Sequence, residues 1–267
     1  MAWADRLRGE KPLIGVVHLP PLPGSPRYGG DMGEVLERAL SDAEAYYSAG
    51  ITWIILENYG DHPYQVRAGP ATVAGMAVAV REVRRALPDA VLGVNMLRNS
   101  GPEALAVAHA AGAQFVRVNA LAEVMEAPEG LLEPVGREVA MLRRLLGAQE
   151  LGVFADVKVK HASPLGSRSL EEVARDAVAR GGADAVIVSG PRTGEPPSPE
   201  EVSRAYSCGA PVLIGSGVTV SNLRTFWKLA DGFIVGTYLK KDGVTTNPVD
   251  PVRVKRLVEE YVKLKGE

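Results

Sequence analysis

Short apolar runs rich in Val and Ile recur along the chain and predict eight β-strands. The runs cover residues 13–17, 53–56, 91–94, 115–118, 152–157, 185–188, 212–214 and 232–235. In most of them apolar residues follow one another without the polar alternation of a half-exposed strand. Strands of this kind are buried on both faces, as in parallel sheets that helices cover. The pattern therefore predicts a parallel sheet in the interior of the protein.

The segments between these runs carry apolar residues at helical spacing, which predicts a helix after every strand. The predicted helices cover residues 35–43, 73–87, 104–111, 134–146, 170–179, 200–206, 220–229 and 252–264. Strict alternation of eight strands with eight helices over 267 residues indicates a single parallel (β/α)8 TIM barrel that spans residues 1–267. An open doubly wound sheet is the alternative fold.

The loops that leave the predicted strands are longer and chemically richer than the turns that return to them. Short Gly and Ala turns lead from helix to strand, whereas the strand-to-helix loops include residues 19–33, 120–132, 159–168 and 237–250. In such barrels the active site lies at the carboxyl ends of the strands, among these loops. We expect the functional residues there.

Polar residues gather at the carboxyl ends of otherwise apolar strands. In strand order they are His18, Glu57, Asn95, Arg117, Asn119, Asp156, Lys158, Lys160, His161 and Ser189. The repetition of this gradient over six strands predicts a shared functional pocket. A structural polar layer that caps the apolar core of the barrel is the alternative.

Asp156 and Lys158 are separated by two positions on one strand, so their side chains should stand on the same face, about 7 Å apart at Cα. We predict Lys158 as a base or as the electrophile of a Schiff base, and Asp156 as its orienting partner. His18, Glu57 and His161 are the candidates for proton transfer. The alternative is an ion-pair network that only fixes the geometry.

The other polar strand ends are predicted to contact the substrate: Asn95, Arg117, Asn119, Lys160 and Ser189. A divalent metal held by His18, Glu57 and Asp156 is conceivable, although no HxH or HExxH spacing supports it, and no cofactor is certain.

A proline-rich loop over residues 19–30 follows His18. Its prolines favour a stiff, extended course, which predicts a lid that carries Arg27 and Tyr28 over the pocket. A structural loop that seals the top of the barrel is the alternative.

Glycine and small hydroxyl residues follow the seventh and eighth strands, at Gly215, Ser216, Gly217, Gly236 and Thr237. In many barrels the loops at these positions hold a phosphate through backbone amides, so we predict that these residues bind the phosphate of a small metabolite. Lys240 and Lys241 are candidates to add positive charge to the same anion, and a solvated surface position is the equal alternative for either. The alternative is that the glycines only permit tight turns.

Composition limits the kinds of binding partner and the cellular compartment that we expect for this protein. The formal net charge of −2 gives no basic excess for nucleic acid, and a single cysteine, Cys208, excludes an internal disulfide. No signal-peptide pattern and no apolar run of about 18 residues is present, so we expect a cytoplasmic protein without a membrane span. Three glutamines in the whole chain are consistent with a heat-adapted source.

Four separated segments resemble the BtpA/SgcQ family: IGVVHLPPLPGSP at residues 14–26, GVNMLRN at 93–99, ADVKVKHA at 155–162 and GTYLKKDG at 236–243. The resemblance spans almost the whole chain and implies a TIM barrel related to the ribulose-phosphate-binding barrels. The family takes its name from a cyanobacterial role in photosystem I biogenesis. Other members occur in non-photosynthetic organisms and beside sugar-utilisation genes.

Two functional hypotheses follow. The first is an enzyme that acts on a phosphorylated sugar or nucleoside-derived metabolite by lyase, isomerase or related acid-base chemistry. The second is a non-catalytic assembly or stability factor of the photosystem I biogenesis type. Barrels of this class often pair through helix faces, so a homo-oligomer is a further expectation, without an interface that the sequence identifies.

Overall fold

Eight parallel strands close into a barrel in the computed structural model, which describes residues 2–157 and 161–267. In chain order the strands are β1 (Leu13–His18), β2 (Trp53–Glu57), β3 (Val91–Asn95), β4 (Phe115–Val118), β7 (Gly152–Asp156), β9 (Ala185–Val188), β10 (Val212–Ile214) and β11 (Gly232–Val235). β1 pairs with both β2 and β11, so the sheet has no free edge. The predicted (β/α)8 barrel is confirmed, and the open sheet is excluded.

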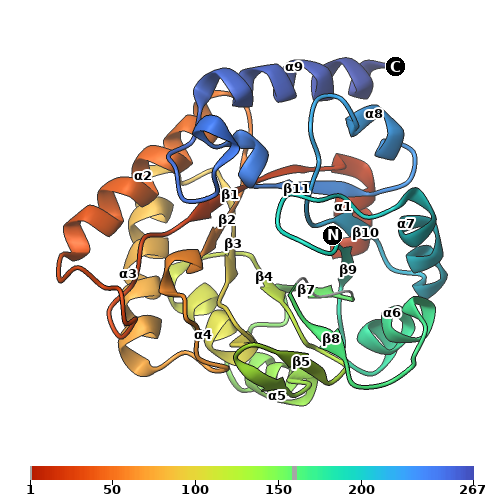
Figure 1. Ribbon diagram of the computed structural model, residues 1–267, viewed down its shortest axis with the longest axis horizontal. Coiled ribbons are helices and arrows are strands. Elements are labelled where there is room, and N and C mark those ends of the chain that lie inside the picture. Colours follow the sequence, from red (N-terminus) through yellow and green to blue (C-terminus); the bar gives the residue numbers. More distant parts are fainter. Residues whose placement is uncertain (1, 158–160) are drawn as a thin grey trace.

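Helices surround the barrel (Figure 1). They are α2 (Met32–Ser48), α3 (Pro70–Ala86), α4 (Gly101–Ala111), α5 (Gly136–Leu145), α6 (Leu170–Ala179), α7 (Pro199–Ala205), α8 (Leu223–Phe226) and α9 (Pro251–Gly266). Ser169 and Ser198 begin α6 and α7 with capping boxes, and Asp250 caps α9.

The helix predicted over residues 220–229 is much shorter in the structure, where α8 is a single turn. The Asn222 side chain explains the difference: its Oδ1 accepts from the N–H of Thr219, and its Nδ2 donates to the carbonyl of Gly217. Local side-chain bonds of this kind compete with helix formation. The chain is therefore held in turns before α8 begins.

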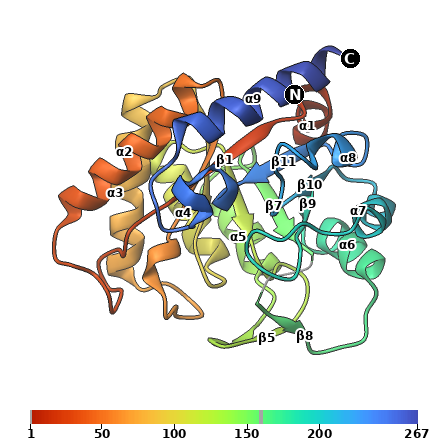
Figure 2. The same ribbon diagram turned by 45° about the horizontal axis from the view of Figure 1, so that its top comes forward.

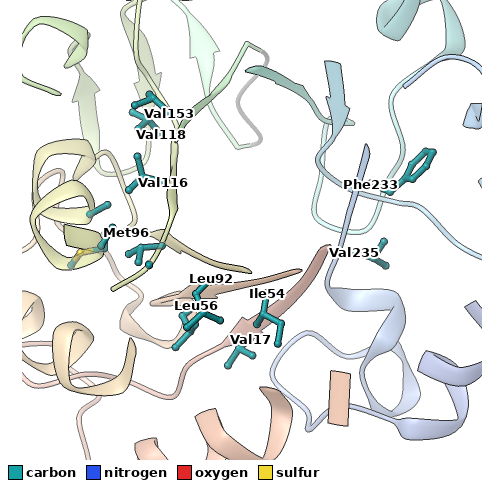
Figure 3. Packing of buried hydrophobic residues seen from close by; sticks show 14 of the residues in the cluster. Val17, Ile54, Leu56, Leu92, Met96, Val116, Val118, Val153, Phe233 and Val235 are labelled. Atoms are coloured by element: carbon teal, nitrogen blue, oxygen red, sulfur yellow. The ribbon is translucent and has the colours of Figure 1, made fainter. Parts of the chain in front are cut away.

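Two apolar layers stabilise the fold, one inside the barrel and one between the barrel and its helices. Ile14, Ile55 and Phe154 belong to the inner layer. The outer layer combines strand residues such as Val17 and Leu92 with helix residues such as Val83 and Leu105. Figure 3 shows strand residues of this layer. Both faces of the strands are thus buried, as their continuous apolar runs predict.

A helix that the sequence pattern did not predict, α1 (Trp3–Glu10), closes one end of the barrel. The Trp3 ring lies 6.1 Å from Trp53, 6.2 Å from Phe115 and 5.4 Å from Phe154, measured between ring centroids. Trp53 and Phe115 are the first residues of their strands, so α1 covers the amino ends. The opposite mouth remains for a functional site.

A second sheet is formed by three very short antiparallel strands: β5 (Met125–Ala127), β6 (Gly130–Leu132) and β8 (Ser163–Pro164). They belong to the loops after β4 and β7, and Figure 2 shows β5 and β8 beyond the barrel strands, on the side away from α1. Strands of two or three residues are too short for a periodic pattern, so they were not predicted. In the part of the chain that the structure describes, no helix is long and apolar enough to cross a membrane.

Candidate active site

The carboxyl ends of neighbouring strands bring the predicted polar residues into one buried layer. His18 pairs in register with Glu57, Glu57 with Asn95, and Asn95 with Arg117. Each of these residues is less than a tenth exposed. The polar ends therefore form a continuous band at the mouth.

Asp156 is tightly held within this band. Arg117 donates to both carboxylate oxygens, from Nε to Oδ2 at 2.9 Å and from Nη2 to Oδ1 at 2.8 Å, and Asn119 Nδ2 donates to Oδ2 at 2.9 Å. Burial opposes the charge on Arg117, but Asp156 and Glu57 outweigh it and raise the pKa of the guanidinium. Asp156 is thus a fixed anion that positions its neighbours.

Glu57 is the less engaged carboxylate. Its Oε2 accepts from Asn95 Nδ2 at 2.6 Å, and its Oε1 lies 3.8 Å from His18 Nε2. The His18 ring is held against the Tyr59 ring in an edge contact, 4.9 Å between centroids. A carboxylate and an imidazole at this separation are suited to proton transfer to or from a bound molecule.

Two adjoining cavities open at this mouth. The first has a volume of about 220 Å³ and is lined mainly by the loops after β9, β10 and β11. The second has a volume of about 320 Å³ and lies on the side of β2, β3, β4 and β7. Glu57, Tyr59, Arg117 and Thr193 line both cavities. These four residues mark the junction between them.

The first cavity contains every residue that the sequence predicted for phosphate binding: Gly215, Ser216, Gly217, Gly236 and Thr237. Gly217 has a φ of +72°, and a Cβ there would lie 2.0 Å from the backbone nitrogen of Pro196. A Cβ on Gly236 would lie 2.6 Å from Cε1 of His18. A side chain at either position would collide with its neighbours, the backbone of Pro196 at Gly217 and the His18 ring at Gly236. Packing alone therefore accounts for these two glycines and leaves ligand binding open.

Arg253 also lines the first cavity, and the sequence pattern gave no reason to select it. It lies in the first turn of α9, where its Nη1 donates to the Tyr238 carbonyl at 3.1 Å and its Nε lies 3.7 Å from Asp250. α9 packs against the turn Thr237–Leu239 that follows β11. The arginine supplies a positive charge beside the glycines.

The remaining predicted site residues are Lys158, Lys160, His161 and Ser189. Lys158 and Lys160 lie outside the described residues. His161 has a φ of +55°, is exposed, and lines the second cavity with its Nε2 3.0 Å from Thr193 Oγ1. Ser189 is fully buried beneath Gly215 and lines neither cavity, so we no longer place it in contact with a ligand.

The proline-rich loop is not a lid. Leu22 N–H donates to Asp61 Oδ1 at 2.7 Å, and Thr72 Oγ1 donates to the Pro23 carbonyl at 2.9 Å, so the loop packs on the segment after β2 and on α3. Arg27 contacts His62, with 2.5 Å between Nη1 and Nε2. Arg27 and Tyr28 line neither cavity.

Neither Lys240 nor Lys241 lines the first cavity. Lys240 is fully buried, and its Nζ donates to Asp42 Oδ2 at 2.8 Å, between α2 and the turn after β11. Burial lowers the pKa of Lys240 to about 8, although Asp42 opposes the change. Lys241 is exposed and lines neither cavity.

The buried Lys240 predicts a pH dependence of stability. The unfolded chain keeps this proton up to about pH 10.5 and the folded chain only up to about 8, so between these values the unfolded state binds more protons. Raising the pH through this window should therefore increase the contribution of Lys240 to the free energy of unfolding, on the order of 2–3 kcal/mol. Urea unfolding between about pH 7 and about pH 10, compared with Lys240→Met, measures it. Identical pH profiles for both proteins would contradict the assignment.

A metal site is not assembled by the proposed set His18, Glu57 and Asp156. Both Asp156 oxygens are occupied by Arg117. Over residues 2–157 and 161–267, no group of three or more His, Cys, Asp or Glu side chains could hold a metal ion.

Comparison with known proteins agrees with this description. A model of the BtpA family matches residues 9–263. An uncharacterized protein of Pyrococcus horikoshii is 48% identical over 253 residues, covering 94% of this chain and 95% of its own. The Photosystem I biogenesis protein BtpA of Synechocystis is 42% identical over 253 residues, covering 94% and 88%.

Solved structures support the fold. Thiamine phosphate pyrophosphorylase from Pyrococcus furiosus superposes with a TM-score of 0.59 at 17% sequence identity, covering 97% of this chain and 98% of its own. At this identity the likeness concerns the fold alone. The family match and the two relatives, by contrast, extend over nearly the whole sequence, and this chain belongs to the BtpA family.

Proposed function

We propose that this protein is an enzyme that acts on a phosphorylated sugar or nucleoside-derived metabolite. The observation that carries the proposal is the pair of adjoining cavities: glycines, Arg253 and His18 line the first, and Glu57, whose Oε1 lies 3.8 Å from His18 Nε2, lines both. They meet at Glu57, Tyr59, Arg117 and Thr193. A substrate that spans both would be held at one end and would react near the junction.

The phosphate would lie in the first cavity. Gly217 and Gly236 would let backbone N–H groups approach an anion closely, and Thr237 and Arg253 would add a hydroxyl and a positive charge. The N–H of Gly215 already donates to the Val188 carbonyl at 2.8 Å, so Gly215 would contribute only close approach of its Cα. α8 begins only at Leu223, well beyond Gly217, so no helix end takes part in this proposal. The name of the thiamine phosphate enzyme with the same fold is in keeping with a phosphorylated ligand.

Proton transfer would use Glu57 and His18. Glu57 lines both cavities, and among the described residues no other carboxylate does so. Asp156, held by three donors, would keep Arg117 and Asn119 in place. We retain Lys158 as the proposed base or electrophile, Lys160, Asn95, Arg117 and Asn119 as proposed substrate contacts, and His161 as a second proton-transfer candidate.

The name of the Synechocystis relative, Photosystem I biogenesis protein BtpA, favours a second candidate, an assembly factor for photosystem I. The relative from Pyrococcus horikoshii is more similar to this chain, at 48% against 42% identity, and its name carries no assembly role. The enzyme proposal accounts for both relatives. An assembly role would tolerate Glu57→Gln, and the enzymatic role would not.

Replacing Arg253 by glutamine should weaken binding of inorganic phosphate about tenfold, because one charge-assisted contact beside the glycines is lost. Isothermal titration calorimetry of phosphate against both proteins measures the change.

Arg256 provides a matched control, because it lies on the same helix, is exposed and lines neither cavity. Arg256→Gln should bind phosphate as the unmodified protein does. Equal affinities in all three proteins would remove Arg253 from the anion site.

A further inference from the structure

The second cavity has an aromatic wall made of Tyr59, His62 and Tyr64. The three rings follow one another with centroids 6.2 Å apart from Tyr59 to His62 and 6.1 Å apart from His62 to Tyr64. All three side chains are half-buried, so each keeps part of its ring surface accessible. A wall of this kind is suited to the face or edge of a flat ring.

The wall is held in place before any ligand arrives. Tyr64 Oη donates to the Tyr59 carbonyl at 2.8 Å, and His62 Nδ1 lies 3.2 Å from the same oxygen. Arg27 holds the other ring nitrogen of His62. Rings fixed in this way lose little conformational freedom when a ligand binds, which favours affinity.

Two amides of the polar band place a second requirement on the ligand, that it donate hydrogen bonds. Asn95 donates its Nδ2 to Glu57, and Asn119 donates its Nδ2 to Asp156, so each carboxylate fixes the orientation of its amide. The two Oδ1 atoms are buried without a hydrogen-bond partner among the described residues, and both side chains line the second cavity. Buried acceptors left unpaired are costly, so they favour a ligand that brings N–H or O–H donors.

We propose that the second cavity receives a flat heterocycle that donates hydrogen bonds, and that the substrate is therefore a nucleoside monophosphate rather than a bare sugar phosphate. This inference rests on the proposed function, because it assumes the phosphate in the first cavity. The sugar would then lie at the junction beside Glu57 and Tyr59. The combined space is in the range of cavities that enclose ligands larger than a sugar phosphate.

The test is calorimetric titration with inorganic phosphate, ribose 5-phosphate and the four common ribonucleoside 5′-monophosphates. At least one nucleotide should bind ten- to a hundredfold more tightly than ribose 5-phosphate, the gain typical of one stacked base. Tyr64→Ala should remove most of this gain and leave the affinity for ribose 5-phosphate unchanged, because Tyr64 lines only the second cavity.

Two variants serve as controls. Tyr64→Phe keeps the ring but loses the hydrogen bond to the Tyr59 carbonyl, so it should keep most of the preference for the nucleotide. Tyr28→Ala, outside both cavities, should change nothing. If every nucleotide binds no better than ribose 5-phosphate, the inference is wrong and the phosphate site stands. If neither phosphate nor any ester binds, the proposed function itself fails.

Discussion

Replacing Glu57 by glutamine should lower turnover of the phosphorylated substrate by about 10²- to 10⁴-fold, the usual effect of losing a general acid or base. Glutamine has nearly the same shape and keeps an oxygen that can accept from Asn95, so the fold and the phosphate cavity should persist. Turnover measured on the compound that binds most tightly, together with its affinity, separates loss of chemistry from loss of binding.

Asp156→Asn is the informative comparison. It removes a negative charge from the same band, but from a carboxylate that Arg117 holds with two hydrogen bonds. We expect it to lower the free energy of unfolding, whereas Glu57→Gln should leave that quantity within about 1 kcal/mol of the unmodified protein. Undiminished turnover in Glu57→Gln would exclude Glu57 from proton transfer.

Arg117→Met should destabilise the protein by about 3–5 kcal/mol, because it leaves Asp156 buried without its cation. Asn119 would remain as the donor to this carboxylate among the described residues, which is not sufficient compensation for a buried charge. Urea unfolding followed by circular dichroism measures the change in free energy.

The exposed Arg137 on α5 provides the control, since Arg137→Met should change stability by less than about 0.5 kcal/mol. The double variant Arg117→Met with Asp156→Leu should recover part of the loss, because an apolar pair of similar volume replaces the buried ion pair. A loss below about 1 kcal/mol in Arg117→Met would mean that water or another cation already compensates Asp156.

The barrel could be predicted because the patterns that identify its strands and helices lie within short stretches of the sequence. Each barrel strand coincides with a continuous apolar run, and the helices between the strands carry apolar residues at helical spacing. Position at the carboxyl end of a strand then sufficed to select His18, Glu57, Asn95, Arg117 and Asp156, since parallel strands in one barrel bring these ends together.

Residues that enter the site from loops and helix starts were missed. Tyr59, Tyr64, Thr193 and Arg253 line the cavities through the course of loops and the packing of α9, and these depend on contacts distant in sequence. α1 was missed as well, because one buried leucine and a tryptophan in eight residues leave no periodic pattern.

Lys240 and Lys241 are adjacent in the sequence but differ in burial. Lys240 is buried against Asp42, whereas Lys241 is exposed. The reason is that Lys240 begins an isolated bridge to Val249, whose N–H also donates to Asp42. No property of the two lysines in the sequence distinguishes these environments.

The most direct test of a phosphate-dependent site is thermal unfolding of the purified protein with a panel of sugar phosphates, nucleoside monophosphates and their unphosphorylated counterparts. A ligand that binds only the folded state raises the midpoint of unfolding. We predict that at least one phosphorylated compound raises it and that its unphosphorylated counterpart does not, with a smaller rise in Arg253→Gln. Equal midpoints with every phosphorylated compound, at concentrations up to the millimolar range, would contradict the account.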